Sequence, residues 1–596
     1  MDADLALYGL QGTQTLAFPV PAGLVPEALT AFVELPPGVT TGTIAVTQGS
    51  RTVSRIDLPP NNSPISIPLV GADVVDNAVT MLLRSQLSPP EGYCLYDTAI
   101  PLRLTNAAVA YTGRELPPQV VADFLPPVLE RLRIFLPESP SRAESDVAVR
   151  LTAAVVARYG EQRTDVDVES IRADEIAPPL PSGPLERNIV VREGATPSVS
   201  LDGTDGVPAL LITGPADELL NQARLLSSDL SRLALASKAV AGPIKSSPQL
   251  PGNQTTIRDL GQPGVNATAL KPQVTVALDQ TRLGRPVKDV RVHLKGSYTP
   301  LPASVSGQVV ASVNGQIVER WPTDASGAID RWVSVPDGLL LRYTNLGVVV
   351  DLSGNTGRCG EFQPVTLTID GATTVETKQA DPPVPAGFQS LPQAMMPRVQ
   401  VGIGENGIAD TQRAVTIIEG LQRLSGLPIH TEVVSVDDAL SAQGPAVIIA
   451  ADGWPGDRPE LPVDSAADGE LDVDRLHGER TTLRLEPGLR FGSLQTIFDD
   501  DRTGLVATSN GDAGELDSLL SWLDDDSRRW AQLSGVAVIG ASGKEPVTVT
   551  GDVSAAEQAS ATETKPTVAV WLGAGAAGAA VIAVIGWLIV RRARRA

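Results

Sequence analysis

The sequence predicts a multidomain α+β protein, in which two β-sandwiches alternate with two α/β domains and a single transmembrane helix follows. Three observations lead to this prediction. The chain has 596 residues, which is more than one hydrophobic core organises. Segments rich in short strands alternate with segments in which strands and helical spacing take turns. Near the C-terminal end, 23 consecutive residues carry no charge.

The two β-segments span residues 4–112 and 252–378. Both contain short apolar runs rich in β-branched residues, such as Thr43–Val46 and Val274–Leu278, and turn residues separate these runs. Proline-rich joints such as Glu115–Pro127 divide them from the neighbouring segments. Helical periodicity is weak in both, and this combination is typical of antiparallel β-sandwiches.

The two α/β segments span residues 128–240 and 397–543. In the first, an apolar strand precedes helical spacing over Asp146–Tyr159. In the second, the strand Val399–Ile403 precedes helical spacing over Thr411–Leu424. Strands that alternate with helices indicate βαβ units, which build parallel sheets.

An internal duplication explains the alternation. Cys94 is followed eight residues later by Leu102–Leu104, and Cys359 is followed eight residues later by Leu367–Ile369. The cysteines therefore occupy matching positions of the two β-segments. If these segments pack about a pseudo-two-fold axis, Cys94 and Cys359 come within reach of a disulfide in an oxidising compartment. Two separately buried thiols are the alternative.

The uncharged run Val568–Val590 predicts a membrane-spanning helix. At about 1.5 Å per residue it is long enough to cross a hydrocarbon core of about 30 Å, which disfavours the alternative of a buried core helix. The predicted interface residues are Trp571, Trp587, Arg591 and Arg592. The positive-inside rule places the basic tail 591–596 in the cytoplasm and the bulk of the chain on the extracytoplasmic side of the cell membrane.

Small residues in this run, among them Gly573, Gly575 and Gly578, predict packing against a partner's transmembrane helix, because they let helix backbones approach closely in lipid. Simple Ala/Gly composition is the alternative. The start of the chain has neither the basic nor the apolar region of a signal peptide. We therefore expect a signal that was trimmed or that lies upstream. A tail-anchored protein facing the cytosol is the alternative, which the arginine-rich tail disfavours.

Charge and residue inventory favour a binding or scaffolding protein over an enzyme. The 69 acidic residues outnumber the 47 basic ones, and the net charge of −22 disfavours nucleic acid as a partner. The chain has three histidines and two cysteines, and it contains no CxxC, HExxH, GxSxG or P-loop motif. The sequence thus predicts no catalytic residue, no cofactor and no metal site.

One glycine-rich turn and a few aromatic residues are candidate binding groups. Gly402–Gly407 fits GxGxxG between a strand and a helix, but Glu405 inside it would repel a pyrophosphate. A turn without a ligand is therefore the favoured interpretation. Pyranose rings stack on flat aromatic rings because their axial C–H faces are apolar. The predicted sugar-binding residues are Trp321, Trp332, Tyr298 and Tyr96, with core or rim packing as the alternative.

The order of β, α/β, β, α/β and membrane helix resembles the B subunit of bacterial cellulose synthase, a family often described as the cyclic-di-GMP-binding regulatory protein. The resemblance extends from about Leu5 to Val590. It implies two jelly-roll-like, carbohydrate-binding-like sandwiches and two flavodoxin-like α/β domains. It also implies a non-catalytic subunit that supports a membrane-embedded family 2 glycosyltransferase and guides the nascent polysaccharide, a cellulose-like β-glucan.

In that family the cyclic-di-GMP site belongs to the catalytic subunit, so the resemblance implies no such site here. Two features depart from the family: the polar linker 546–566 has no apolar face that would form an interfacial helix, and a signal sequence is absent. Two other functions remain as alternatives. One is a stand-alone, adhesin-like carbohydrate-binding protein of the cell surface, and the other is a nucleotide-dependent Rossmann-type enzyme.

Overall fold

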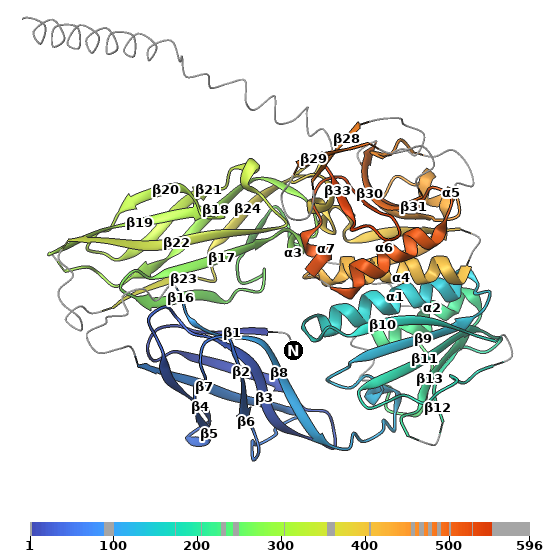
Figure 1. Ribbon diagram of the computed structural model, residues 1–596, viewed down its shortest axis with the longest axis horizontal. Helices are drawn as coiled ribbons and strands as arrows, with labels where there is room; N and C mark the ends of the chain where they lie inside the picture. The colour runs from blue at the N-terminus through green and yellow to red at the C-terminus, as the bar shows by residue number, and fades with distance from the viewer. Residues whose placement is uncertain are drawn as a thin grey trace, which may run out of the picture. The chain divides into compact units, whose positions relative to one another are not determined.

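The computed structural model (Figure 1) describes residues 3–88, 100–172, 175–203, 206–227, 234–241, 250–302, 304–354, 364–404, 407–453, 459–463, 470–474, 480–484, 490–499, 502–526 and 528–550. The helices and strands described below belong to one unit, Met1–Val549. No helix within these described ranges is long and apolar enough to cross a bilayer. The predicted span Val568–Val590, its flanking residues and residues 551–566 of the predicted linker lie outside the described residues. The start of the predicted linker 546–566 is instead part of the folded unit, because Val547–Val549 forms a strand there.

Sandwich 1 is built from two four-stranded antiparallel sheets, ordered β1-β8-β3-β6 and β2-β7-β4-β5. Its strands are β1 (Ala3–Leu7), β2 (Thr13–Pro19), β3 (Leu24–Glu34), β4 (Thr41–Gln48), β5 (Arg51–Asp57), β6 (Ser63–Pro68), β7 (Ala78–Ser88) and β8 (Leu102–Gly113). Alternate residues of each strand point between the sheets, as Leu29, Ala31 and Val33 do on β3. The β-sandwich that the sequence predicts is present, and this strand order agrees with the jelly roll that the resemblance implies.

Sandwich 2 contains the same orders, with β16-β23-β18-β21 in place of β1-β8-β3-β6 and β17-β22-β19-β20 in place of β2-β7-β4-β5. Its first sheet has six strands, because β24 also pairs with β18 and β15 pairs with β24. Its elements are β15 (Gln254–Thr256), β16 (Gly264–Ala269), β17 (Gln273–Asp279), α3 (Gln280–Leu283), β18 (Val287–Tyr298), β19 (Val305–Val313), β20 (Gln316–Pro322), β21 (Ala328–Ser334), β22 (Tyr343–Gly354), β23 (Val365–Asp370) and β24 (Thr374–Gln379). The matching runs Leu102–Leu104 and Leu367–Ile369 lie on the equivalent strands β8 and β23. The shared strand order is what the predicted duplication of the β-segments implies.

The first α/β domain contains one mixed sheet in the order β10-β9-β11-β13-β12-β14. Its elements are β9 (Arg131–Pro137), α1 (Arg142–Tyr159), β10 (Asp165–Ile171), β11 (Glu186–Glu193), β12 (Ser198–Asp202), β13 (Ala209–Gly214), α2 (Ala216–Ser227) and β14 (Lys238–Ala239). The sequence favours the start of α1 because Ser141 and Glu144 form a reciprocal capping box.

The second α/β domain has the order β26-β25-β27-β31-β30-β32-β33-β28-β29, whose first six strands match the first domain one by one. Its elements are β25 (Arg398–Ile403), α4 (Gly407–Arg423), β26 (His430–Ser435), α5 (Val436–Ser441), β27 (Ala446–Ala450), β28 (Glu470–Asp474), β29 (Arg480–Arg484), β30 (Gly492–Asp499), β31 (Arg502–Ser509), α6 (Ala513–Asp525), α7 (Arg528–Gln532), β32 (Ala537–Gly540) and β33 (Val547–Val549). The two α/β segments thus share a strand order as well, as the predicted duplication implies.

The prediction of parallel, flavodoxin-like sheets holds for four strands of each domain and is wrong for the rest. Strands β10, β9, β11 and β13 are parallel, as are β26, β25, β27 and β31. Beyond them β12 and β30 run antiparallel to their neighbours. The reason is connection length: β30 and β31 are two residues apart, enough for a hairpin and too few for the crossover that a parallel pair needs.

The two α/β domains contact each other through equivalent elements, α1 and α4. The hydroxyl of Thr411 on α4 donates to the hydroxyl of Ser145 on α1 at 2.8 Å, and these residues stand 266 positions apart. The next residues reach across reciprocally: Asp146 accepts from the backbone N–H of Val433 on β26, and Gln412 donates to the carbonyl of Val168 on β10. Such a two-fold arrangement is isologous, with the same surface used on both sides.

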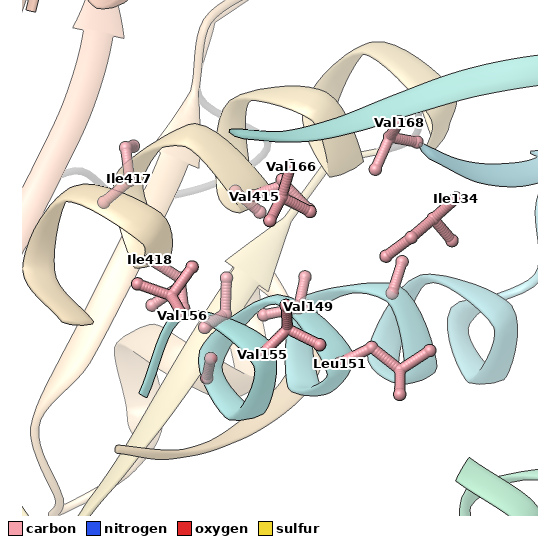
Figure 2. Packing of buried hydrophobic residues seen from close by; sticks show 14 of the residues in the cluster. Ile134, Val149, Leu151, Val155, Val156, Val166, Val168, Val415, Ile417 and Ile418 are labelled. Carbon is pink, nitrogen blue, oxygen red and sulfur yellow. The ribbon is translucent and has the colours of Figure 1, made fainter. Parts of the chain in front are cut away.

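Apolar side chains fill this helix–helix contact. Figure 2 shows Val149 and Val156 of α1 with Val415 and Ile418 of α4, and Val166 of β10 beside them. These side chains belong to one buried cluster that extends through both α/β domains. The domains therefore share a core across their contact.

We expect Gly420→Ala to destabilise the second α/β domain by about 1–3 kcal/mol, because a Cβ at Gly420 would lie 2.1 Å from Cε2 of the buried Trp530 ring. That overpacking outweighs the gain in helix propensity of about 1 kcal/mol. Gly160→Ala, after α1, is the matched control, since a Cβ there meets no atom within 4 Å. Urea unfolding measures both changes, and equal midpoints for the two variants would contradict the packing argument.

Candidate functional site

Three of the predicted sugar-binding aromatic residues lie in the described part of sandwich 2, and two of them are buried. Trp321 is 8% exposed and Tyr298 is 4% exposed. Strand β20 continues through Pro322, so Trp321 faces inward opposite the core residue Val309 and is not in a loop. The Tyr298 hydroxyl accepts the backbone N–H of Asp324 at 2.6 Å. Neither ring presents a face to solvent, so the expectation of a stacking platform is not met for either.

Trp332 lies on the outer face of β21 and is half-buried. Its indole stacks on the His293 imidazole, with centroids 4.5 Å apart and an interplanar angle of 12°. The Arg291 guanidinium lies 4.6 Å from the centroid of the indole, and His293 also bonds to Asp330 at 2.5 Å. The indole is thus already engaged by two protein groups, and a sugar would have to displace one of them.

The remaining predicted site residues lie outside the described residues. They are Tyr96, Cys94, Cys359, Gly573, Gly575, Gly578, Trp571, Trp587, Arg591 and Arg592. The sugar-binding role of Tyr96, the disulfide, the helix packing and the membrane interface therefore stay predictions.

Sandwich 1 carries an exposed aromatic residue that the sequence analysis did not select. Phe32 on β3 is 47% exposed, on the face opposite to Ala31 and Val33. It borders an open hollow of about 370 Å³ on the outer face of the sheet, lined by Thr30, Ala31, Phe32, Pro64, Ile65, Ser66 and Asn106. The signal in the sequence is an aromatic residue on the polar side of an alternating strand.

A β-bulge opens this face. The pairing of β3 with β8 shifts register between Thr30 and Phe32, which leaves two residues of β8, Asn106 and Ala107, between the paired positions Thr105 and Ala108. Asn106 has φ of +51°, in the left-handed region that Asn tolerates better than most residues. The bulge explains why a hollow forms at this point of the ladder.

Strand register makes this hollow equivalent to the surroundings of Trp332. In sandwich 1, Thr30 lies opposite Ser66 on β6, and in sandwich 2, His293 lies opposite Trp332 on β21. The matching runs set the register: Val33 on β3 lies opposite Leu104, and Gly296 on β18 lies opposite Ile369. Thr30 and His293 each stand three residues earlier on these strands, so the two pairs occupy the same place in the two sandwiches. The side chains at this place differ between the two sandwiches.

The glycine-rich turn of the second α/β domain holds one of the protein's own carboxylates. Asp410 on α4 accepts the backbone N–H of Gly404 at 3.1 Å and pairs with Arg413 at 2.7 Å, and both side chains are buried. Burial raises the pKa of Asp410, although Arg413 opposes the shift. In dinucleotide-binding folds this place, before the helix N-terminus, receives the pyrophosphate. Here a carboxylate already accepts from the turn.

The first α/β domain has the same device. Glu144, which stands 266 positions before Asp410, accepts the backbone N–H groups of Ser141 and Glu193, both at 2.7 Å. Around Arg413, Asp517 and Asp452 add further carboxylates, at 2.7 Å and 4.0 Å. No group of three or more His, Cys, Asp or Glu side chains arranged to hold a metal ion occurs among the residues that the structure describes.

No family model matches the chain, and no curated protein matches it. Three solved structures illustrate the similarities that were found. An acetyl xylan esterase from Butyrivibrio proteoclasticus is 9% identical, over 28% of this chain and 43% of that one, with a TM-score of 0.12. A family two carbohydrate esterase from Clostridium thermocellum in complex with cellohexaose is 10% identical, over 28% of this chain and 46% of that one, with a TM-score of 0.12.

The third is the tandem CBM22 domain pair of Xyn10C from Paenibacillus barcinonensis, which is 8% identical over 62% of this chain and 85% of that one, with a TM-score of 0.13. The chain spans less than half the length of the two esterases. At TM-scores of this size the three similarities carry no argument about fold or function. The β-sandwich assignment therefore depends on the strand order alone.

Proposed function

We propose that this chain is a non-catalytic, membrane-anchored subunit of a polysaccharide synthase, which supports a membrane-embedded glycosyltransferase and guides a cellulose-like β-glucan as it emerges. The observation that carries the proposal is the duplicated order of sandwich and α/β domain, with matching strand orders in each pair. That order is what the resemblance to the cellulose synthase B subunit implies. The predicted span Val568–Val590 is the proposed anchor, with the folded unit on the extracytoplasmic side.

The charge of the chain supports a neutral polymer as the partner. A net charge of −22 repels polyanions, including nucleic acid and acidic polysaccharides. It does not oppose an uncharged glucan. A guiding surface also has to release the polymer as it advances, so weak binding through few contacts fits the role.

The filled turns of the α/β domains disfavour the nucleotide-dependent enzyme. Asp410 and Glu144 place a carboxylate against the backbone N–H groups that a phosphate would need. Two anions at one helix start repel each other, so a nucleotide would first have to displace a buried, hydrogen-bonded carboxylate. Both α/β domains are instead proposed as scaffolds that join the sandwiches.

The test is co-purification of the full-length chain from its native membranes in mild detergent. We expect a multi-span glycosyltransferase to co-purify, and we expect Gly575→Leu with Gly578→Leu to reduce the recovered enzyme because the small-residue helix face is lost. The matched control is Gly444→Ala, an exposed position where a Cβ meets no atom within 4 Å and the backbone is not in the left-handed region. Recovery of glucan without any glycosyltransferase would contradict the proposal and support the stand-alone surface protein.

A further inference from the structure

The hollow beside Phe32 in sandwich 1 is a candidate ligand site by its chemistry. Ligand sites are mainly apolar with a few polar groups that fix orientation, and volumes of about 300–1,000 Å³ are usual. Phe32 and Pro64, whose side chains point outward, supply the apolar side-chain surface of a hollow of about 370 Å³, and the inward-facing core residues Ala31 and Ile65 complete its lining. The polar groups are the hydroxyls of Thr30 and Ser66 and the side-chain amide of Asn106.

Two of these polar groups have no hydrogen-bond partner among the residues that the structure describes. Within the described part of the chain, the Ser66 hydroxyl and the Asn106 amide make no hydrogen bond to protein, whereas the Thr30 hydroxyl donates to the carbonyl of Ala108 at 3.3 Å. A hydroxyl and an amide provide both donors and acceptors, which is what sugar hydroxyls need. They stand beside the exposed Phe32 ring, on which the apolar face of a pyranose stacks.

Charge selects among sugars. None of the seven lining residues is charged, so nothing in the hollow compensates a carboxylate, a sulfate or an ammonium group. The chain as a whole carries −22, which adds repulsion against acidic sugars. An uncharged hexose is the ligand that matches both facts.

The equivalent place in sandwich 2 has the opposite character. Two residues after Thr30, sandwich 1 has Phe32 opposite Pro64. Two residues after His293, sandwich 2 has Lys295 opposite Asp330 at the equivalent place. Ser66 is replaced by Trp332, whose indole lies against His293 and Arg291. In sandwich 2, side chains that contact one another therefore cover the outer face of the sheet where sandwich 1 has the open hollow.

We infer that the hollow lined by Thr30, Phe32, Ser66 and Asn106 binds one pyranose ring of a neutral β-linked glucan, and that the equivalent face of sandwich 2 does not. This inference rests on the proposed function only for the identity of the polymer. It assigns glucan contact to one sandwich of the pair, so the duplicates divide their roles.

The experiment titrates the full-length chain in detergent with cellohexaose, and with a β-1,3-linked hexasaccharide to separate linkage from composition. We expect Phe32→Ala to weaken cellohexaose binding by about fivefold or more, since a stacking contact is lost. Ser66→Trp, which copies the sandwich 2 residue into the hollow, should weaken it at least as much. Trp332→Ala is the matched control and should stay within about twofold of the wild type.

Phe32 is exposed, so the fold should tolerate Phe32→Ala, and Phe32→Tyr should retain binding because the ring is kept. Wild-type binding that Phe32→Ala and Ser66→Trp leave unchanged would overturn the site and leave the proposed function standing. Loss of binding in Trp332→Ala would overturn the division of roles. If the wild type binds neither oligosaccharide, both the inference and the polymer-guiding part of the proposed function fail, while co-purification with a glycosyltransferase still tests the subunit role.

Discussion

Glu115→Gln is expected to destabilise the first α/β domain by about 3–5 kcal/mol, because it leaves the Arg187 guanidinium buried without its counter-ion. The Arg187 side chain is 1% exposed and the Glu115 side chain is 4% exposed, and Nη2 of Arg187 lies 2.5 Å from Oε1 of Glu115. The other carboxylate oxygen accepts the backbone N–H of Leu185, and Nε of Arg187 donates to the carbonyl of Phe124. The pair thereby fixes the proline-rich joint Glu115–Pro127 to β11.

Two comparisons separate the charge effect from general disturbance. Arg187→Met combined with Glu115→Leu removes both charges, and it should recover most of the lost stability because an apolar pair can replace a buried ion pair. Asp73→Asn breaks an exposed ion pair with Arg51, in which the Arg51 side chain is 47% exposed and the Asp73 side chain is 72% exposed. This substitution should change the free energy of unfolding by less than about 1 kcal/mol. Thermal unfolding measures the stability of the three variants. A double variant that is no more stable than Glu115→Gln would contradict the argument that the unpaired charge is what destabilises the domain.

The sequence predicts the repeated architecture because the spacing of apolar residues is similar in the two halves of the chain. Helical spacing over Asp146–Tyr159 and Thr411–Leu424 corresponds to α1 and α4, and the apolar runs fall on strands whose buried residues alternate. These signals are local, since they depend on which side of an element faces the core. Matching local patterns in two halves of a chain predict matching folds without further information.

Strand direction and side-chain exposure are less accessible from the sequence. The antiparallel strands β12 and β30 depend on short connections, which apolar runs alone do not distinguish from crossovers. Trp321 follows a strand and precedes a proline, which suggests a loop, yet β20 extends to Pro322 and buries the ring. Phe32 had a readable signal, because it interrupts the polar side of an alternating strand. The hollow beside it depends on a β-bulge, and the local sequence pattern does not predict that bulge.

The filled turn at Gly404 shows what motif matching leaves out. The spacing of Gly402–Gly407 fits a dinucleotide fingerprint, and the structure places it between β25 and α4 as the motif requires. The residue that decides the matter is Asp410, which lies outside the motif and accepts from Gly404. A carboxylate at the third or fourth helical position, able to reach back to the turn, is the signal that distinguishes a closed turn from an open one.

The stability of the contact between the α/β domains is expected to fall as pH rises, because of Glu419 on α4. Its side chain is 3% exposed, and burial raises the pKa of its carboxyl from 4.5 to about 8, although Arg423 opposes the shift. Asp524 and Asp165 add negative charge around it. Arg423 also donates to the carbonyl of Thr164 at 2.8 Å, across the contact between the domains.

The sign follows from proton counts. In the unfolded chain Glu419 loses its proton near its ordinary pKa of 4.5, whereas in the folded chain it keeps the proton until about pH 8. Between these values the unfolded state binds fewer protons, so stability decreases by up to about 1.4 kcal/mol per pH unit from this group alone. Below the lower value both states are protonated, and the contribution of Glu419 is then constant.

Glu419→Gln should therefore flatten the dependence of stability on pH, since the amide keeps an acceptor for Arg423 and cannot ionise. From about pH 5 to about pH 8, we expect the wild type to lose up to about 4 kcal/mol more stability than the variant, with the variant the more stable of the two at the upper end. Urea midpoints across this range measure the difference. Glu27→Gln, at an exposed carboxylate of sandwich 1, is the matched control and should follow the wild type. Parallel curves for the wild type and Glu419→Gln would show that the Glu419 carboxylate is already ionised in the folded protein, held by Arg423 in spite of its burial.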